Sequence, residues 1–235
     1  MFYPLSGGRI SYISVYGYIV MKVLIFDTES TGLPVEEKDP FHYPEYWPRL
    51  VQLAWILADD EQILEEQSFI ISPEGFTIPR SATEVHGITH ERAKEEGRPL
   101  QEILALFSEA LSQAEVIVGH NVSFDRSVIT AEFARTKQNA PILGLPYHCT
   151  MKTTVDVCKI PSKVRGRGFK WPSLTELHTH LFEDPFEDVH DALADVRACS
   201  RCYFELKKQG LFQELRSKPD AKEGKYKKRF GNPRY

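Results

Sequence analysis

The sequence lacks three features, each of which would point to a specific class of protein. It has no run of about 18 apolar residues without a charge, so we expect no membrane-spanning helix. It has no second Cys-x-x-Cys to complete a zinc site with Cys199 and Cys202, so we expect structural thiols in a reducing cytoplasm. It also lacks an overall basic charge: the net charge is −4, and binding of nucleic acid would depend on local patches.

Length and composition predict one globular domain. The 235 residues are 42% hydrophobic and 26% charged, which is enough for a substantial core, and no internal repeat is present. We expect residues 1–20 to be an upstream extension from a misassigned start codon, because Met21 leads directly into a strand. The domain itself is predicted to span residues 21–210. Residues 211–235 form a basic tail that we expect to be flexible.

The strongest signal is the apolar run Val23–Phe26, which is followed by Asp27 and Glu29. Four consecutive apolar residues predict a buried central strand. Side chains alternate along a strand, so the two acids point to the same side and can bind one cation. Taken alone, they could equally be solvated acids at a strand end. The turn that follows, Ser30–Gly32, has hydroxyls and backbone N–H groups suited to a phosphate or a sugar.

Hydrophobic periodicity predicts an α/β architecture. Strands at 50–58 and 62–71 would form an antiparallel three-strand meander with the first strand, and 116–118 would add another strand. The predicted helical segments are 81–85, a short helix capped by Thr89, 99–112, 124–134, 150–158, 174–182 and 192–209. Strands followed by alternating helices and strands predict a mixed sheet flanked by helices.

Two loops flank the predicted site. The segment 33–49 is rich in proline and aromatic residues, and it would either cover the sheet edge or stack on bases. We favour covering, except for Leu33. The segment 161–172 contains several Lys and Arg residues, which would either contact phosphates or stay solvated.

Two later stretches place further acids at the starts of helices. Asp125 lies in the first turn of one predicted helix, and Asp195 lies about one turn inside the last long helix. His190 precedes that helix, which Asp188 or Asp191 would cap, so the imidazole can move. A fixed carboxylate beside a mobile imidazole suits metal binding beside a general base. Each residue alone has an ordinary explanation, since an acid in a first turn also favours the helix dipole.

Together, these stretches resemble the DEDD 3′–5′ exonucleases, in the branch that uses histidine as general base. The motifs are Asp27-x-Glu29, His86-Gly-Ile-Thr89, Asn121-x-x-Phe124-Asp125 and His190-x4-Asp195. The resemblance extends from about residue 22 to about residue 208. Members of this branch include proofreading epsilon subunits and ribonuclease T. It implies an α/β ribonuclease-H-like fold, in which an antiparallel three-strand meander and parallel strands form one mixed sheet.

The resemblance also implies two divalent ions, Mg²⁺ or Mn²⁺, which suit a site made of oxygen ligands. Asp27 would bridge both ions, Glu29 and Asp195 would serve the ion that activates water, and Asp125 would serve the other. Two ions about 3.5–4 Å apart can activate water and stabilise the leaving oxygen. His190 would take the proton of the water, a task that suits an ordinary histidine pKa of about 6.5.

Substrate contacts are expected around this centre. The candidate residues are Thr28, Ser30, Thr31, Gly32, Leu33, His86, Asn121, Phe124 and Lys170. Leu33 resembles the family's apolar wedge between the last two bases. Phe124 would either pack under the site or belong to the core.

These expectations predict a metal-dependent exonuclease that releases nucleoside 5′-monophosphates from 3′ ends. DNA is favoured over RNA, with a role in proofreading or repair and with a polymerase or another replication or repair protein as candidate partner. One alternative is a catalytically silent nucleic-acid-binding scaffold, which would not require five such groups. The other alternative is an enzyme that trims RNA or oligoribonucleotides.

Overall fold

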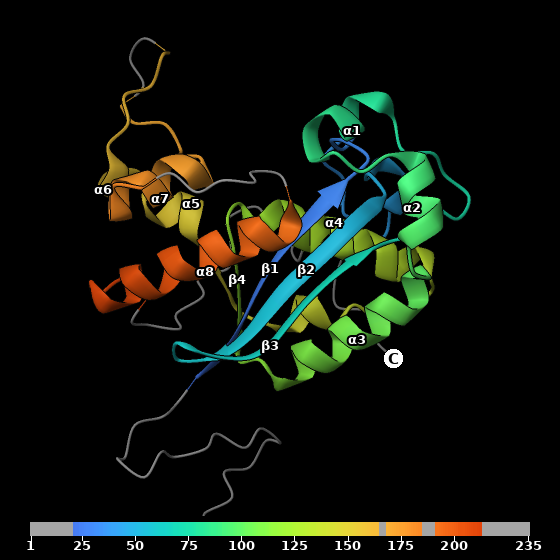
Figure 1. Ribbon diagram of the computed structural model, residues 1–235, viewed down its shortest axis with the longest axis horizontal. Helices are drawn as coiled ribbons and strands as arrows, with labels where there is room; N and C mark the ends of the chain where they lie inside the picture. The colour runs from blue at the N-terminus through green and yellow to red at the C-terminus, as the bar shows by residue number, and fades with distance from the viewer. Residues whose placement is uncertain (1–20, 165–167, 185–190, 213–235) are drawn as a thin grey trace, which may run out of the picture.

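The computed structural model describes residues 21–164, 168–184 and 191–212, and a five-stranded sheet lies at its centre (Figure 1). The strands are β1 (Lys22–Ser30), β2 (Leu50–Asp59), β3 (Gln62–Ile70), β4 (Val116–Gly119) and β5 (Tyr147–Cys149). Their order is β3-β2-β1-β4-β5. The first three strands are antiparallel neighbours, while β4 runs parallel to β1 and β5 parallel to β4. The predicted meander with parallel strands is confirmed.

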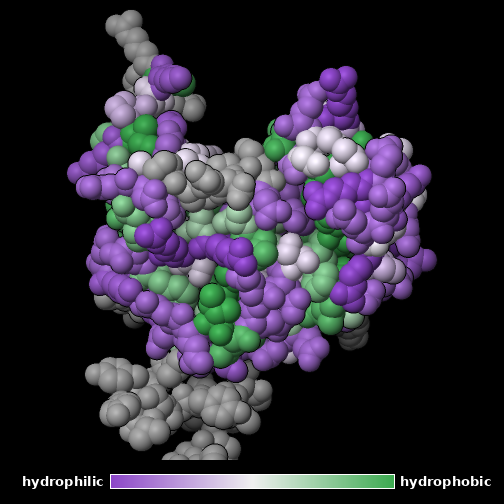
Figure 2. Space-filling view, in the orientation of Figure 1, coloured by the Kyte–Doolittle hydropathy of each residue, from purple (hydrophilic) through white to green (hydrophobic). Residues whose placement is uncertain are grey.

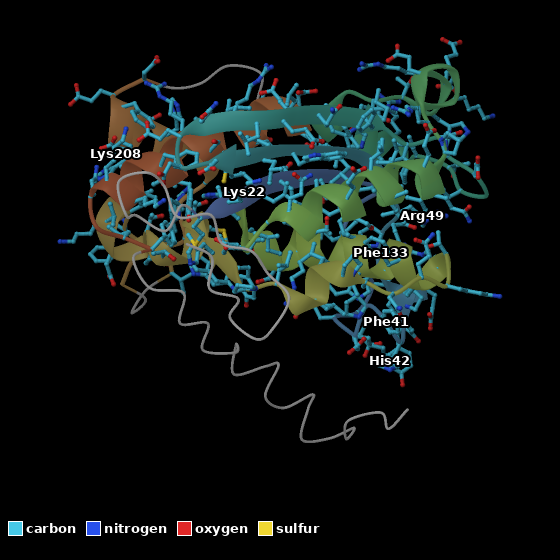
Figure 3. The ribbon with its side chains drawn as sticks, turned by 90° about the horizontal axis from the view of Figure 1, so that it is seen from below. Lys22, Phe41, His42, Arg49, Phe133 and Lys208 are labelled. Carbon is cyan, nitrogen blue, oxygen red and sulfur yellow. The ribbon has the colours of Figure 1, made fainter. Side chains whose placement is uncertain are left out.

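Helices cover both faces of this sheet. They are α1 (Arg80–His86), α2 (His90–Glu96), α3 (Leu100–Gln113), α4 (Val122–Arg135), α5 (Thr150–Thr153), α6 (Val155–Cys158), α7 (Leu174–Phe182) and α8 (Ala192–Lys208). Short 3-10 helices span Pro44–Tyr46 and Pro141–Gly144. The α8 helix lies across one face, and α3 and α4 lie against the other (Figures 1 and 3).

The β1 strand contributes to both cores, as its continuous apolar run predicts. Val23 and Ile25 pack with α8, while Leu24 and Phe26 pack with α3 and α4. All four side chains are fully buried. This strict alternation sets which face each polar residue at the end of β1 will occupy.

Three local features differ from the sequence-based expectation. The β5 strand was not predicted, because its three residues, Tyr-His-Cys, form no apolar run. The predicted helix 150–158 is divided at Thr154, whose hydroxyl donates to the carbonyl of Thr150 at 2.7 Å. Hydroxyls that bond back to a carbonyl four residues earlier often bend a helix. The fourth helix begins at Val122, two residues earlier than expected.

The expected extension, residues 1–20, lies outside the described residues. The expected tail, residues 211–235, also lies outside them apart from Leu211 and Phe212, which pack against core residues of α8. Among the described residues, no helix is long and apolar enough to cross a membrane.

Candidate active site

The two acids of β1 meet the last helix at the end of the strand. Asp27 and Glu29 follow Val23 and Ile25 in the alternation, so they point to the face that α8 covers. Asp195 lies in the first turn of α8. One carboxylate oxygen from each of the three acids lies within 4.8 Å of the others. The structure therefore brings together three of the four predicted metal ligands from distant parts of the chain.

Asp125, the fourth predicted ligand, is held from the opposite face of the sheet. It lies in the first turn of α4 and is 4% exposed. Its Oδ1 accepts hydrogen bonds from the backbone N–H of Thr28 at 3.2 Å and from the Thr28 hydroxyl at 2.6 Å. Thr28 stands between the two acids of β1, so it ties the start of α4 directly to the cluster.

The electrostatics identify these four acids as one system. Burial raises the pKa of Asp27 well above its ordinary value, and the charges of Asp125 and Asp195 raise it further. Burial and the charge of Asp195 raise the pKa of Glu29 to about 8. The pKa of Asp125 is raised to about 7 by burial, against the lowering effect of the Thr28 hydrogen bonds. Buried carboxylates whose pKa values are raised by desolvation and mutual repulsion commonly mark a functional site.

The start of α8 is fixed by a side chain of β2 that sequence reasoning missed. Asp191 caps the helix: its Oδ1 accepts from the N–H groups of Leu193 and Ala194, both at 3.1 Å. Gln52 donates from Nε2 to Asp191 Oδ2 at 3.2 Å, and its Oε1 accepts from Ala192 N–H at 3.2 Å. Gln52 stands opposite Glu29 in the strand register. This clamp positions the turn that carries Asp195.

A signal for Gln52 existed in the sequence. It is a polar residue within the otherwise apolar run of β2, and it is 5% exposed in the structure. A buried amide requires hydrogen-bond partners, so its position in a buried strand predicts a specific polar contact. The identity of the partner, 139 residues away, could not be read from that signal.

The turn after β1 is held in one conformation by its own contacts. The Ser30 hydroxyl donates to the carbonyl of Gly32 at 2.9 Å, and Gly32 has a φ of 142°. Thr31 and Arg49 exchange two hydrogen bonds of 2.9 Å, from Thr31 N–H to Arg49 O and from Arg49 N–H to Thr31 Oγ1. Leu33 projects from this turn and is 82% exposed. The predicted wedge is thus free to contact a substrate.

A buried ion pair with α4 supports the turn that follows β1. Arg49 donates from Nε to Glu132 Oε1 at 2.9 Å, and Arg135 Nη1 lies 3.0 Å from the same oxygen. Glu132 has no exposed surface. Figure 3 shows Arg49 near Phe133 of α4, at the opposite end of the sheet from Lys22. The ion pair ties the loop 33–49 to α4.

The other predicted substrate residues lie in mixed environments. Asn121 precedes α4 with a left-handed backbone, φ 70° and ψ 34°. Phe124 packs partly on the core and contacts Trp47, with ring centroids 6.4 Å apart. His86 is 7% exposed, and its Nδ1 accepts from Ile88 N–H at 3.1 Å. Their contacts with a substrate stay predictions.

Lys170 and His190 are the remaining predicted site residues. Lys170 donates from Nζ to both carboxylate oxygens of Glu176, at 2.5 and 2.7 Å, so a phosphate would have to compete with that carboxylate. His190, the predicted general base, lies outside the described residues. The next residue in the chain, Asp191, is the N-cap of α8 that Gln52 contacts. The role of His190 therefore stays a prediction.

Comparison with known proteins shows the family. A model of the RNase T family, described as exonuclease, matches residues 24–203. The chain belongs to this exonuclease family. The match includes all four acids of the cluster, and the recognition made from the motifs is confirmed.

Relatives of this exonuclease domain include polymerase proteins. It is 28% identical over 191 residues to a PolC-type DNA polymerase III of Latilactobacillus sakei, covering 79% of this chain and 11% of the relative. It is 29% identical over 113 residues to a DNA polymerase III subunit epsilon of Treponema pallidum, covering 48% of this chain and 46% of the relative. The chain therefore spans only a part of these relatives.

The fold is also that of a solved exonuclease. Exonuclease I of E. coli, in complex with a dA16 oligonucleotide, superposes with a TM-score of 0.61 at 21% identity. The match covers 80% of this chain and 41% of that protein. The exonuclease domain thus has the predicted ribonuclease-H-like fold.

Proposed function

We propose that the protein is a metal-dependent 3′–5′ exonuclease that removes nucleoside 5′-monophosphates from single-stranded DNA ends. The observation that carries this proposal is the cluster of Asp27, Glu29 and Asp195, with Asp125 beside it. Buried acids of one sign destabilise a fold unless a cation compensates them. Membership of an exonuclease family supports hydrolysis as the purpose of the cluster. A silent scaffold would have no use for it.

The donor set fits hard divalent cations. The cluster offers carboxylate oxygens, which suit Mg²⁺ and Mn²⁺, and its four acids are enough for two ions. We propose that Asp27 would be the shared ligand of this site, that Glu29 and Asp195 would hold the ion that activates water, and that Asp125 would hold the other ion. When bound, such ions supply an activated water and stabilise charge on the leaving oxygen.

The chain's own residues position the reaction. The Gln52–Asp191 clamp fixes the first turn of α8, so Asp195 keeps its place relative to β1. We propose that His190, next to Asp191 in the chain, accepts the proton of the attacking water. The Ser30–Gly32 turn and the exposed Leu33 would hold the terminal nucleotide.

DNA is proposed as the substrate because the relatives are DNA polymerase III proteins and Exonuclease I was solved with DNA oligonucleotides. We propose a role in proofreading or repair in the cytoplasm, with a polymerase as candidate partner. RNA trimming is the competing substrate choice, and the experiment below includes it.

The test uses one 20-nucleotide sequence as single-stranded DNA, duplex DNA with a recessed 3′ end, and RNA. With a 5′ label and Mg²⁺ or Mn²⁺, we expect a ladder that shortens from the 3′ end, fastest on single-stranded DNA. EDTA should stop it and added Mn²⁺ should restore it. Full activity in excess chelator would contradict the metal site. A faster reaction on RNA would reverse the substrate assignment. If no strand is degraded, the proposed exonuclease activity is refuted.

A further inference from the structure

A hairpin between α6 and α7 projects from the molecule next to the active site. The bridge between Pro161 and Phe169 pairs its arms, with hydrogen bonds from Ser162 N–H to Gly168 O at 3.0 Å and from Lys170 N–H to Ile160 O at 2.8 Å. Figure 1 shows it as the gold and orange projection above α5, α6 and α7. Figure 2 shows this projection on the opposite side of the upper surface from the projection that contains α1.

The base of the hairpin is fixed to the sheet at the level of the carboxylates. His120 follows β4, and its Nε2 donates to the carbonyl of Pro172 at 3.0 Å. Its Nδ1 lies 3.0 Å from the hydroxyl of Thr150, and burial lowers the pKa of His120 to about 4, so the ring is neutral. Because β4 runs parallel to β1, His120 and Asp27 lie at the same edge of the sheet. The hairpin therefore rises directly beside the site.

Two large aromatic side chains of this hairpin are exposed. Trp171 is 61% exposed and Phe169 is 44% exposed, while Trp55 of the core has no exposed surface. Lys170 between them turns toward Glu176 of α7. Since side chains alternate along an extended segment, Phe169 and Trp171 share the opposite face. Exposed aromatic residues grouped in this way commonly mark a binding surface.

The positive charge of residues 157–175 indicates the kind of partner that this surface would bind. Between residues 157 and 175 the sequence has five Lys or Arg and no Asp or Glu, although the net charge of the whole chain is −4. Lys170 is paired with Glu176, which leaves four basic residues in the segment without that partner. A basic segment that carries exposed aromatic rings matches a nucleic-acid strand, whose phosphates pair with cations and whose bases stack on the rings.

We propose that Phe169 and Trp171 form a stacking surface for the single-stranded nucleic acid upstream of the terminal nucleotide. Alternate residues of an extended segment are about 7 Å apart, which is about twice the 3.4 Å rise per nucleotide. Two rings at that spacing accept one base between them or one base each. This surface rests on the proposed function, because it extends the path of the same strand away from the carboxylates.

The test measures binding separately from hydrolysis. Anisotropy of fluorescein-labelled dT20 is measured in EDTA for the wild type, Trp171→Ala, Phe169→Ala and Trp171→Phe. Loss of one stacked base should weaken binding by about 5–150-fold for Trp171→Ala, while Trp171→Phe keeps most of the affinity. Ile63→Ala is the matched control, because Ile63 is 54% exposed on β3 at the far end of the sheet, and it should bind as the wild type does.

Kinetics distinguish a binding surface from a general structural effect. The second substrate is the p-nitrophenyl ester of thymidine 5′-monophosphate, which has no upstream strand. For Trp171→Ala, the ratio of kcat/KM on dT20 to kcat/KM on the ester should fall by the factor seen in binding. Equal losses on both substrates, or unchanged dT20 affinity, would contradict the proposal that these rings bind the strand. If the wild type binds dT20 through Trp171 but hydrolyses neither substrate, the surface stands and the proposed function fails.

Discussion

Acidic side chains gather at both ends of the β1–β3 meander, with opposite electrostatic surroundings. At the β2–β3 turn, Asp60 and Glu61 face Lys207 and Lys208 of α8, at 3.0 and 2.9 Å. At the other end, the charges that act most strongly on Glu29 belong to other carboxylates. The first end is exposed and neutralised, and the second is largely buried and dominated by one sign.

This difference separates acids that form ordinary surface ion pairs from acids that we propose to bind metal ions. Exposed ion pairs such as Lys207–Asp60 contribute about 0–1 kcal/mol each. Gathered buried carboxylates oppose folding, so their retention requires a function that compensates for the repulsion. The comparison can be tested by changing one end at a time.

The largest effect is expected at the cluster itself. Asp195→Asn removes one carboxylate charge while keeping the shape of the side chain, so the exonuclease rate should fall by about 10⁴-fold or more. The same change should leave the metal-free protein as stable as the wild type or more stable, because repulsion is relieved. Rates on labelled dT20 and thermal unfolding in EDTA measure both. A variant that keeps more than about a hundredth of the rate would contradict the role of Asp195.

The next effect concerns the proposed general base. His190→Ala should reduce the rate by about 10²–10⁴-fold and remove the acidic limb of the pH–rate profile, with metal affinity nearly unchanged. Calorimetry with Mn²⁺ and a pH series from 5 to 9 measure the two properties. If His190→Ala loses the metal but keeps the acidic limb, the base lies elsewhere.

A smaller loss of exonuclease rate is expected from a change at Gln52, which contacts the start of α8. Gln52→Leu removes the clamp on Asp191 and Ala192, so the start of α8 should shift and the rate should fall by about 10–100-fold. Ser68→Ala serves as control, since it removes only the other partner of the Gln52 amide, 3.1 Å away. Equal effects of the two changes on kcat would show that the clamp on α8 has no special part in catalysis.

The cluster should also make stability depend on pH. The folded-state pKa values of Glu29 and Asp125 are raised to about 8 and about 7, above their unfolded values. The folded protein therefore binds more protons, and in EDTA its stability should fall as pH rises from about 4 to about 8. The loss is on the order of several kcal/mol, and Mg²⁺ or Mn²⁺ should reverse it at pH 8. Urea unfolding at pH 5 and pH 8 measures it, and metal-independent stability at pH 8 would contradict this account.

The smallest effect is expected at the neutralised end. Lys207→Met should change the free energy of unfolding by about 1 kcal/mol or less, with the dT20 rate unchanged. The side chains of Lys207 and Asp60 are 29% and 65% exposed, so solvent screens the pair. A loss of activity in this variant would show that the two ends of the sheet are coupled.

Local sequence signals predicted much of the fold and most of the cluster. Val23–Phe26 is an uninterrupted apolar run, so its burial and the shared side of Asp27 and Glu29 follow from the geometry of one strand. The first turn of α8 could be recognised from its helical period, and Asp191 was one of two candidate caps. Family motifs then linked these segments, which physical reasoning on separate stretches could not do.

The features that could not be predicted depend on contacts between distant residues. Thr28 bonds Asp125 across 97 residues, and Gln52 bonds Ala192 across 140 residues. Neither partner is implied by the local pattern around the other. The pairing of Lys170 with Glu176 is local, but either a phosphate or a carboxylate satisfies an ammonium group, so the sequence alone left that choice open.

The clamp between β2 and α8 has a consequence for protein synthesis. Gln52 leaves the ribosome early, but Asp191 and Asp195 follow only after well over a hundred further residues have been translated. A nascent chain, or one cleaved before α8, leaves Val23 and Ile25 uncovered and lacks Asp195, one of the proposed metal ligands. We therefore expect the proposed activity to arise only after the last described helix has been translated and has folded onto the sheet.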